Sequence, residues 1–236
     1  MRLLFFDTET TGLDTKTDDI LELAVCSYDT VSKRSYAAAS FIFKTNKEIP
    51  KEVEELHGLS KDLLDREGFT PGEWIPRNAG VLFSSPYFVV AHNARAFDVP
   101  LLESWCLRNG YPLEIPKNKV LDTRTDLPRE AYKISCKSQA HLLAEKGIAN
   151  PFPHNAMSDV MALIRLFEFY DFSEIEKIAH SPTKKLVALT SFEEKELPKA
   201  AGFSWDGNKK HWFKEIKEIY LEDELRKINF KYNTVE

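Results

Sequence analysis

Apolar residues are spaced along this chain in two ways. Compact runs, in which neighbouring positions are both apolar, are typical of strands buried on both faces of a sheet. Such runs predict strands at residues 3–9, 20–28, 35–43, 87–91 and 120–123. Apolar residues that recur every three or four positions predict helices at residues 49–56, 99–109, 135–146 and 155–170. Prolines and glycines interrupt this spacing in residues 69–85, where the pattern favours neither structure.

The order of these elements predicts the fold class. Three strands in succession within residues 1–44 are typical of an antiparallel meander, and the strands and helices that follow alternate. This order predicts an α/β domain over residues 1–181, with a mixed five-stranded sheet flanked by helices. Residues 183–236 predict a second, small α+β domain with a strand at 186–189, a helix at 192–201 and a hairpin at 203–213.

Composition and charge narrow the class of protein. The chain has 236 residues, of which 43% are apolar and 29% are charged, as in an ordinary globular protein. Its net charge of −5 argues against holding a nucleic acid by overall attraction, so such a ligand would need local basic residues or bridging metal ions. Three cysteines without a Cys-x-x-Cys pair argue against a disulfide framework. The chain opens on a strand and has no apolar run of membrane-spanning length, so we expect a cytoplasmic protein with no membrane partner.

Two acidic residues, Asp7 and Glu9, end the first predicted strand. Because side chains alternate along a strand, both project from the face that Leu3 and Phe5 begin. Two buried like charges repel each other unless a cation neutralises them, and carboxylate oxygens favour Mg²⁺ or Mn²⁺ over Zn²⁺. The alternative is a strand end that runs into solvent, and the pair alone favours that alternative.

Two further acids and a histidine stand at element boundaries where they could converge with this pair. Asp98 lies between a predicted strand and a helix, where it is either a metal ligand or a helix N-cap. Asp159 lies beside the apolar stripe of the helix at 155–170, so its charge requires a partner. His154 precedes that helix and is either structural or a base that takes a proton from water near neutral pH. Phosphodiester hydrolysis with two metal ions needs this kind of convergence.

Three segments together resemble the motifs of a known family. Residues 6–13 read Phe-Asp-Thr-Glu-Thr-Thr-Gly-Leu, residues 92–98 contain His-Asn-Ala and Phe-Asp, and residues 154–159 read His-x-Ala-x-x-Asp. Residues 20–24, 57–58 and 122–123 match secondary landmarks. Over residues 1–171 the chain resembles the DEDDh 3′–5′ exonucleases, which include the proofreading subunit of bacterial replicative DNA polymerase, exonuclease X, ribonuclease T and oligoribonuclease.

The resemblance implies a fold, an activity and a set of site residues. The implied fold is a ribonuclease H-like sheet, and the implied activity is the removal of nucleotides one at a time from a 3′ end. Two Mg²⁺ or Mn²⁺ ions are implied, with His154 as the general base. The implied metal ligands are Asp7, Glu9, Asp98 and Asp159. The positions that match the terminal-nucleotide pocket of the family are Thr10, Leu13 and His57, for which turn formation and packing are the alternative.

One segment departs from the family pattern. Two residues, Arg95 and Ala96, separate His-Asn-Ala from Phe-Asp, where the family usually has one. We expect a bulge or a longer loop to absorb the extra residue and still present Asp98.

The resemblance leaves several functions open. Single-stranded DNA is the favoured substrate, and trimming of RNA 3′ ends or clearance of short oligoribonucleotides is the alternative. An inactive nuclease fold that only binds nucleic acid is disfavoured because all five catalytic residues are present. A zinc hydrolase that uses His154 and His180 is disfavoured because paired ligands are lacking. A polymerase or another replication or repair protein is a candidate partner, and no oligomeric state is predicted.

The second predicted domain has a short resemblance of its own. Residues 192–213 are similar to small modules appended to bacterial and phage DNA-processing proteins. Two tryptophans, Trp205 and Trp212, alternate there with Lys209 and Lys210. These residues either stack on bases and neutralise phosphates, or the tryptophans fill the core that so small a domain needs.

Overall fold

The chain forms two compact units, Met1–Ala179 and His180–Glu236, each with an apolar core of its own. This arrangement comes from a computed structural model that describes residues 1–83, 88–128, 137–191 and 193–235. All the residues of the predicted active site belong to the first unit.

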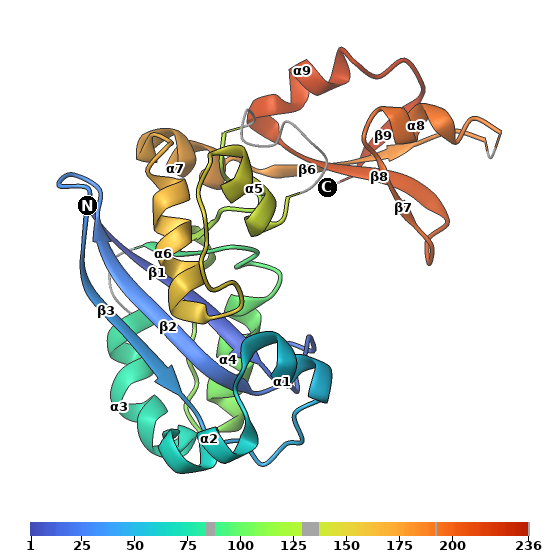
Figure 1. Cartoon of the computed structure of the whole chain (residues 1–236). Coiled ribbons are helices and arrows are strands. Elements are labelled where there is room, and N and C mark those ends of the chain that lie inside the picture. The colour runs from blue at the N-terminus through green and yellow to red at the C-terminus, as the bar shows by residue number, and fades with distance from the viewer. Residues whose placement is uncertain (84–87, 129–136, 192, 236) are drawn as a thin grey trace. The chain divides into compact units, whose positions relative to one another are not determined.

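The first unit is built on a mixed five-stranded sheet with the strand order β3-β2-β1-β4-β5 (Figure 1). Its strands are β1 (Arg2–Thr10), β2 (Ile20–Asp29), β3 (Arg34–Ile42), β4 (Phe88–Ala91) and β5 (Val120–Asp122). The first three are antiparallel, and β4 runs parallel to both β1 and β5. The five predicted strands and the mixed sheet are confirmed, with position 87 outside the described residues. Because β1 and β4 are parallel neighbours, their carboxyl ends meet at one edge of the sheet.

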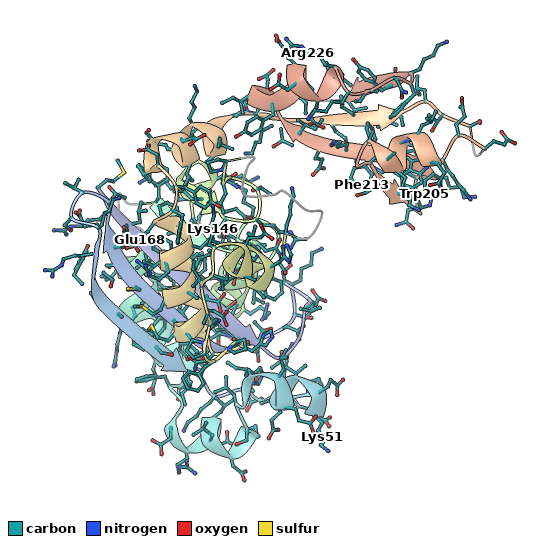
Figure 2. The ribbon with its side chains drawn as sticks, turned by 45° about the horizontal axis from the view of Figure 1, so that its top comes forward. Lys51, Lys146, Glu168, Trp205, Phe213 and Arg226 are labelled. Carbon is teal, nitrogen blue, oxygen red and sulfur yellow. The ribbon has the colours of Figure 1, made fainter. Side chains whose placement is uncertain are left out.

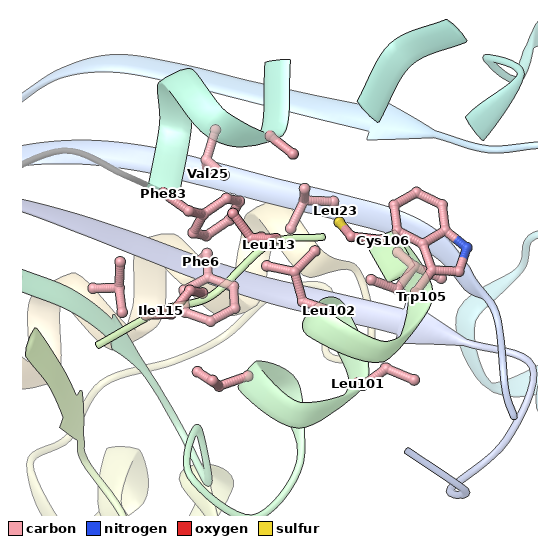
Figure 3. Packing of buried hydrophobic residues seen from close by; sticks show 14 of the residues in the cluster. Phe6, Leu23, Val25, Phe83, Leu101, Leu102, Trp105, Cys106, Leu113 and Ile115 are labelled. Carbon is pink, nitrogen blue, oxygen red and sulfur yellow. The ribbon is translucent and has the colours of Figure 1, made fainter. Parts of the chain in front are cut away.

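Helices cover both faces of this sheet (Figure 1). The helices of this unit are α1 (Lys51–His57), α2 (Lys61–Glu67), α3 (Pro71–Phe83), α4 (Asp98–Arg108), α5 (Gln139–Glu145), α6 (Ala156–Phe167) and α7 (Phe172–His180), with the short 3₁₀ helix η1 (Lys117–Lys119) before β5. On one face α6 packs with α5 and α7 over Leu3 and Phe5. On the other face Phe6 lies in one cluster with Leu102 of α4 and Phe83 of α3 (Figure 3).

Several helix boundaries differ from the sequence prediction. The helix predicted at 155–170 ends at Phe167, because residues 168–170 form a turn. The helix predicted at 135–146 begins at Gln139, since Ser138 caps it, and residues 135–136 lie outside the described part of the chain. Within the undecided segment 69–85, residues 71–83 form α3, which continues through Pro76, and residues 84–85 lie outside the described part of the chain. The amphipathic helix α7 was not predicted, although Asp171 marks its start by accepting the amide of Ser173 at 2.8 Å.

The second unit forms a four-stranded antiparallel sheet with the order β7-β8-β6-β9. Its elements are β6 (Thr183–Ala188), α8 (Glu196–Ala200), β7 (Ser204–Asp206), β8 (His211–Lys217), the 3₁₀ helix η3 (Glu218–Tyr220), α9 (Leu221–Leu225) and β9 (Tyr232–Val235). The predicted hairpin is confirmed, the helix predicted from 192 begins at Glu196, with position 192 outside the described residues, and α9 and β9 were not predicted. Leu186, Phe203 and Ile216 form the buried core. In the described part of both units, no helix has the length and apolar composition needed to cross a membrane.

Candidate active site

Two acids of β1 and one acid of α6 lie together at the carboxyl end of β1. Asp7 and Glu9 continue the face on which Leu3 and Phe5 are buried, and α6 packs against that face. Asp159 lies in the first turn of α6. Carboxylate oxygens of Asp7, Glu9 and Asp159 lie within 4.8 Å of one another. The fold therefore joins two distant sequence motifs into one cluster of oxygen ligands.

Burial and mutual repulsion disfavour the charged forms of these carboxyls. Burial raises the pKa of Asp7 well above its usual value, and the charges of Asp98 and Asp159 raise it further. Burial, followed by the charge of Asp159, raises the pKa of Glu9 to about 8. A divalent cation relieves this repulsion, and converging carboxylate oxygens suit a hard cation such as Mg²⁺ or Mn²⁺. The cluster consists of carboxylates alone, so it fits such a metal and does not favour the zinc alternative.

Hydrogen bonds fix the orientation of the Asp159 carboxylate. Its Oδ1 accepts from Gln139 Nε2 at 3.1 Å and from Asn150 Nδ2 at 2.9 Å. Its Oδ2 accepts from the backbone amide of His154 at 2.9 Å. Burial raises the pKa of Asp159, and the His154 amide opposes that shift. Gln139 and Asn150 were not found from the sequence, since neither belongs to a motif and both meet Asp159 only after folding.

Asp98 is buried at the first position of α4, next to the cluster. Its Oδ1 accepts a hydrogen bond from the hydroxyl of Thr8 at 2.8 Å, and the N-cap position before it is occupied by Phe97. The N-cap alternative for Asp98 is therefore wrong. Burial raises the pKa of Asp98 to about 7, although the Thr8 hydrogen bond acts in the other direction. Asp98 is not one of the three clustered carboxylates, but its charge acts directly on Asp7.

The turn that leads to Asp98 has room for the extra residue of this chain. After β4, Asn93 adopts a left-handed backbone with φ 67°, which asparagine tolerates better than most residues. The amide of Val99 then bonds to the carbonyl of Ala94 at 2.9 Å, one residue further back than in a regular α-helix. This widened turn is the expected bulge, and it lies at the helix start rather than in a strand.

Two buried acids hold this turn to the loop that follows β5. Asp122 accepts the amides of Asn93 at 2.9 Å and Arg95 at 3.1 Å. The guanidinium of Arg95 contacts Asp126 at 2.6 Å and donates to the carbonyl of Val120 at 2.6 Å. Asp126 is fully buried, so this ion pair is shielded from water on one side. Arg95, one of the two residues in this longer segment, thus supplies a cation that anchors the turn.

His154 lies at the exposed edge of the site, directly before α6. Its backbone has φ 62°, a left-handed conformation that is uncommon outside glycine and asparagine. This conformation accompanies the bond from its amide to Asp159. Its side chain is close enough to affect the pKa of both Asp159 and His57. His154 therefore lies beside the carboxylates, as a base for an attacking water requires.

A fifth acid, Glu22, faces the cluster from β2. It pairs in register with Glu9, and its charge raises the pKa of Asp7, Glu9 and Asp159. Its Oε2 accepts the amide of Ala156 at 3.3 Å, and its Oε1 accepts the hydroxyl of Ser40. Glu22 was noted only as part of the landmark at 20–24. The signal in the sequence that could have identified Glu22 is its position as an acid inside an otherwise apolar strand.

The three predicted substrate contacts differ in their surroundings. The hydroxyl of Thr10 donates to the carbonyl of Gly12 at 2.6 Å, which is a turn-forming role. Leu13 is 86% exposed, so packing does not explain it. His57 Nδ1 accepts the amide of Leu59 at 3.0 Å. Burial lowers the pKa of His57, while the backbone carbonyl of Thr10 opposes the shift. Thr10 and His57 are therefore neighbours, and the contact of all three with a nucleotide stays a prediction.

Known proteins share both the sequence motifs and the fold. An exonuclease family model matches residues 4–167. A PolC-type DNA polymerase III of Clostridium perfringens is 31% identical over 198 residues, which make up 82% of this chain and 13% of that protein. The DNA polymerase III subunit epsilon of Treponema pallidum is 28% identical over 175 residues, 69% of this chain and 73% of that protein.

Solved structures are similar to this chain in fold. The crystal structure of E. coli exonuclease I in complex with a dT13 oligonucleotide superposes with a TM-score of 0.61 at 20% identity. The superposition covers 80% of this chain and 48% of exonuclease I. The chain thus spans about half the length of this structural neighbour and a much smaller part of the PolC-type relative.

Proposed function

The chain belongs to the exonuclease family, and we propose from this premise that it is a metal-dependent enzyme that hydrolyses nucleic acid from the 3′ end. The observation that carries the proposal is the cluster of Asp7, Glu9 and Asp159 oxygens within 4.8 Å of one another. Asp98 and His154 lie beside that cluster. A protein that only binds nucleic acid has no use for five such residues, so their presence together favours an enzyme.

Each residue has a distinct role in the proposed reaction. Asp7, Glu9 and Asp159, with Asp98, would hold two divalent cations, which would stabilise the charge on the phosphate and on the leaving 3′ oxygen. His154 takes the proton from the water that attacks the phosphorus. Its exposure lets that proton pass on to solvent. The products are a nucleoside monophosphate and a strand shorter by one nucleotide.

We propose single-stranded DNA as the substrate and Mg²⁺ or Mn²⁺ as the metal. Support comes from the fold shared with E. coli exonuclease I, which was crystallised with dT13. The exposed Leu13 and the residues Thr10 and His57, which are neighbours of each other, are proposed to contact the terminal nucleotide. A replicative polymerase is the proposed kind of partner, since the relatives include DNA polymerase III proteins.

One assay tests this proposal. The release of mononucleotides is measured from 3′-labelled single-stranded DNA, duplex DNA and RNA, with Mg²⁺, with Mn²⁺ and with EDTA. We expect metal-dependent release that is fastest from single-stranded DNA and absent in Asp7→Ala. Asp65→Ala is the matched control, because Asp65 is an exposed acid of α2 that pairs with Lys61. Equal behaviour of wild type and Asp7→Ala on every substrate overturns the enzymatic proposal, and faster release from RNA overturns the choice of DNA.

A further inference from the structure

The hairpin of β7 and β8 in the second unit carries an exposed tryptophan that the proposed active site does not use. We propose that this hairpin binds single-stranded DNA, with a base stacked on Trp205 and phosphates paired with Lys209 and Lys210. The inference rests on the proposed function, because the strand that it binds is the substrate of the first unit. Its experiment nevertheless separates the failure of one from the failure of the other.

The hairpin presents these side chains on a fixed turn. Trp205 pairs in register with Trp212, and Asp206 pairs with His211. The Asp206 carboxylate accepts the amides of Asn208 and Lys209, both at 3.0 Å. The side chain of this acid is thus engaged by the turn. In Figure 1 the turn extends past the other elements of the second unit. A turn held in this way loses little entropy when it binds a ligand.

The two tryptophans of the hairpin have different environments. Trp212 packs against the core cluster of the second unit, with Leu186 and Ile216. Trp205 is outside that cluster and is 50% exposed, at the end of the second unit in Figure 2. The ring centroids are 5.5 Å apart and the rings are inclined by 60°. Trp212 therefore fills the core and supports Trp205 from one side, which leaves part of the Trp205 indole available to a base.

The charges around Trp205 suit a phosphate backbone. Lys209 and Lys210 are exposed in the turn, and neither forms an ion pair with any residue that the structure describes. Proteins that bind single strands without sequence preference combine stacking aromatic side chains with such basic residues. Because the whole chain carries a net charge of −5, local lysines are needed to attract a polyanion.

Another aromatic side chain of the same hairpin is less suitable. Phe213 lies on the opposite face of the sheet from Trp212, since side chains alternate along β8. The Nζ of Lys185 lies 4.2 Å from the centroid of the Phe213 ring, so a cation already covers that ring. Figure 2 shows both Phe213 and Trp205 on the second unit. The observations therefore favour the Trp205 face as the binding surface.

The test measures the affinity of the full chain for a fluorescein-labelled dT20 strand by anisotropy, in EDTA to prevent cleavage. We expect Trp205→Ala to weaken binding about 5- to 150-fold, the range for the loss of one base stack. Trp205→Leu keeps apolar bulk but has no aromatic face, so it should weaken binding to a similar extent. Trp205→Phe should restore most of the affinity. A 20-base-pair duplex, whose bases are already stacked, should bind weakly and respond little to these variants.

The lysines are tested by the dependence of affinity on salt. Lys210→Glu should weaken binding and lower the slope of log affinity against log salt by about 0.7, the value for one phosphate contact to a single strand. Lys231→Glu is the matched control, because Lys231 is exposed before β9 at the other edge of the sheet. Equal effects of the two lysine variants overturn the placement of the phosphates at the turn.

Two outcomes separate this inference from the proposed function. Hydrolysis of the p-nitrophenyl ester of thymidine 5′-monophosphate with Mn²⁺ reports on the first unit alone. If Trp205→Ala binds dT20 like wild type while the ester is hydrolysed, the hairpin inference is wrong and the proposed function stands. If wild type hydrolyses neither the ester nor dT20 but Trp205→Ala still weakens binding, the proposed function is wrong and the hairpin remains a binding site.

Discussion

Glu9 makes the stability of the metal-free protein depend on pH. Burial raises its pKa to about 8, whereas a carboxyl in an unfolded chain titrates near 4.3. The folded state therefore binds this proton more tightly than the unfolded state. The stability that the protonated carboxyl contributes is complete at low pH and is lost as the pH rises through about 8.

Because the charged form of Glu9 is disfavoured in the folded protein, we expect Glu9→Gln to stabilise the metal-free protein at pH 8. The amide stays neutral, so it removes a repulsive charge from the cluster. At pH 8 in EDTA the melting temperature should rise by several degrees, since each kcal/mol of added stability raises it by about 2–4 °C. At pH 5 the melting temperature should change little. Thermal melts followed by circular dichroism measure both values.

Once metal is added, Glu9→Gln should be less stable than wild type rather than more stable. Mn²⁺ stabilises whatever state binds it, so wild type should gain more stability than Glu9→Gln and should alone retain activity. Glu55→Gln, an exposed acid of α1, is the matched control and should behave like wild type. A Glu9→Gln protein that melts below wild type at pH 8 in EDTA would contradict the burial of repelling charges.

His154 combines a left-handed backbone with the proposed chemistry, and one substitution separates these contributions. His154→Asn should keep the fold, because asparagine tolerates the left-handed conformation at φ 62°, but it cannot take a proton. We expect kcat to fall about 10²- to 10⁴-fold with Mn²⁺ affinity little changed. A kcat close to that of wild type would show that another group takes the proton.

At the scale of elements, the turn between β4 and α4 depends on the ion pair of Arg95 and Asp126. Loss of one partner leaves a charge buried, which costs about 3–5 kcal/mol for buried pairs. Arg95 is one third exposed, so we expect Arg95→Ala to destabilise the first unit by about 3 kcal/mol and to lower its melting temperature by about 6–12 °C. Chemical denaturation of the full chain measures the free energy of unfolding, and a thermal melt measures the melting temperature.

A double-mutant cycle tests whether the pair is the cause. Arg95→Ala in the background of Asp126→Asn should cost much less than in wild type, because the partner charge is already gone. Arg66→Ala is the matched control, since Arg66 pairs with Glu67 at an exposed position and should change stability by less than about 1 kcal/mol. Equal costs of Arg95→Ala in both backgrounds would show that the ion pair does not anchor the turn.

The elements predicted correctly are those whose own residues carry the signal. The run that begins at Leu3 is apolar on both faces and became the central strand. The segment with Pro76 could not be decided locally, because a proline normally disrupts a helix interior, yet Trp74, Ile75 and Phe83 bury one face against the sheet. Tertiary packing therefore decided what local propensity left open.

The residues of the site likewise differ in whether their own sequence context carries a signal. Asp7, Glu9, Asp98, His154 and Asp159 belong to short motifs, so the sequence alone singles them out, and their roles in catalysis stay a prediction. The sequence does not single out their supporting partners, because Gln139 and Asn150 meet Asp159 only through the fold. The buried acid Asp126 likewise looks like any surface acid until its contact with Arg95 is known.

At the scale of the whole molecule, the two units have no core residue in common among the residues that the structure describes. The clusters around Phe6 and Phe5 lie within residues 1–179, and the cluster around Leu186 lies within residues 180–236. Since each unit buries its own apolar side chains, each supplies its own hydrophobic stabilisation. We therefore expect thermal unfolding of the full chain to show two transitions rather than one cooperative transition.

Removing the second unit tests this independence together with its proposed role. A chain that ends at Ala179 should keep one of the two thermal transitions and hydrolyse the p-nitrophenyl ester at a rate within about twofold of wild type, because the hydrogen bonds to Asp159 and Asp98 all come from the first unit. Its affinity for dT20 should fall at least as far as that of Trp205→Ala, since the whole stacking surface is gone. If the shortened chain binds dT20 as tightly as wild type, the second unit has no part in holding the strand. If it fails to fold, the two cores depend on each other in a way that their separate clusters do not reveal.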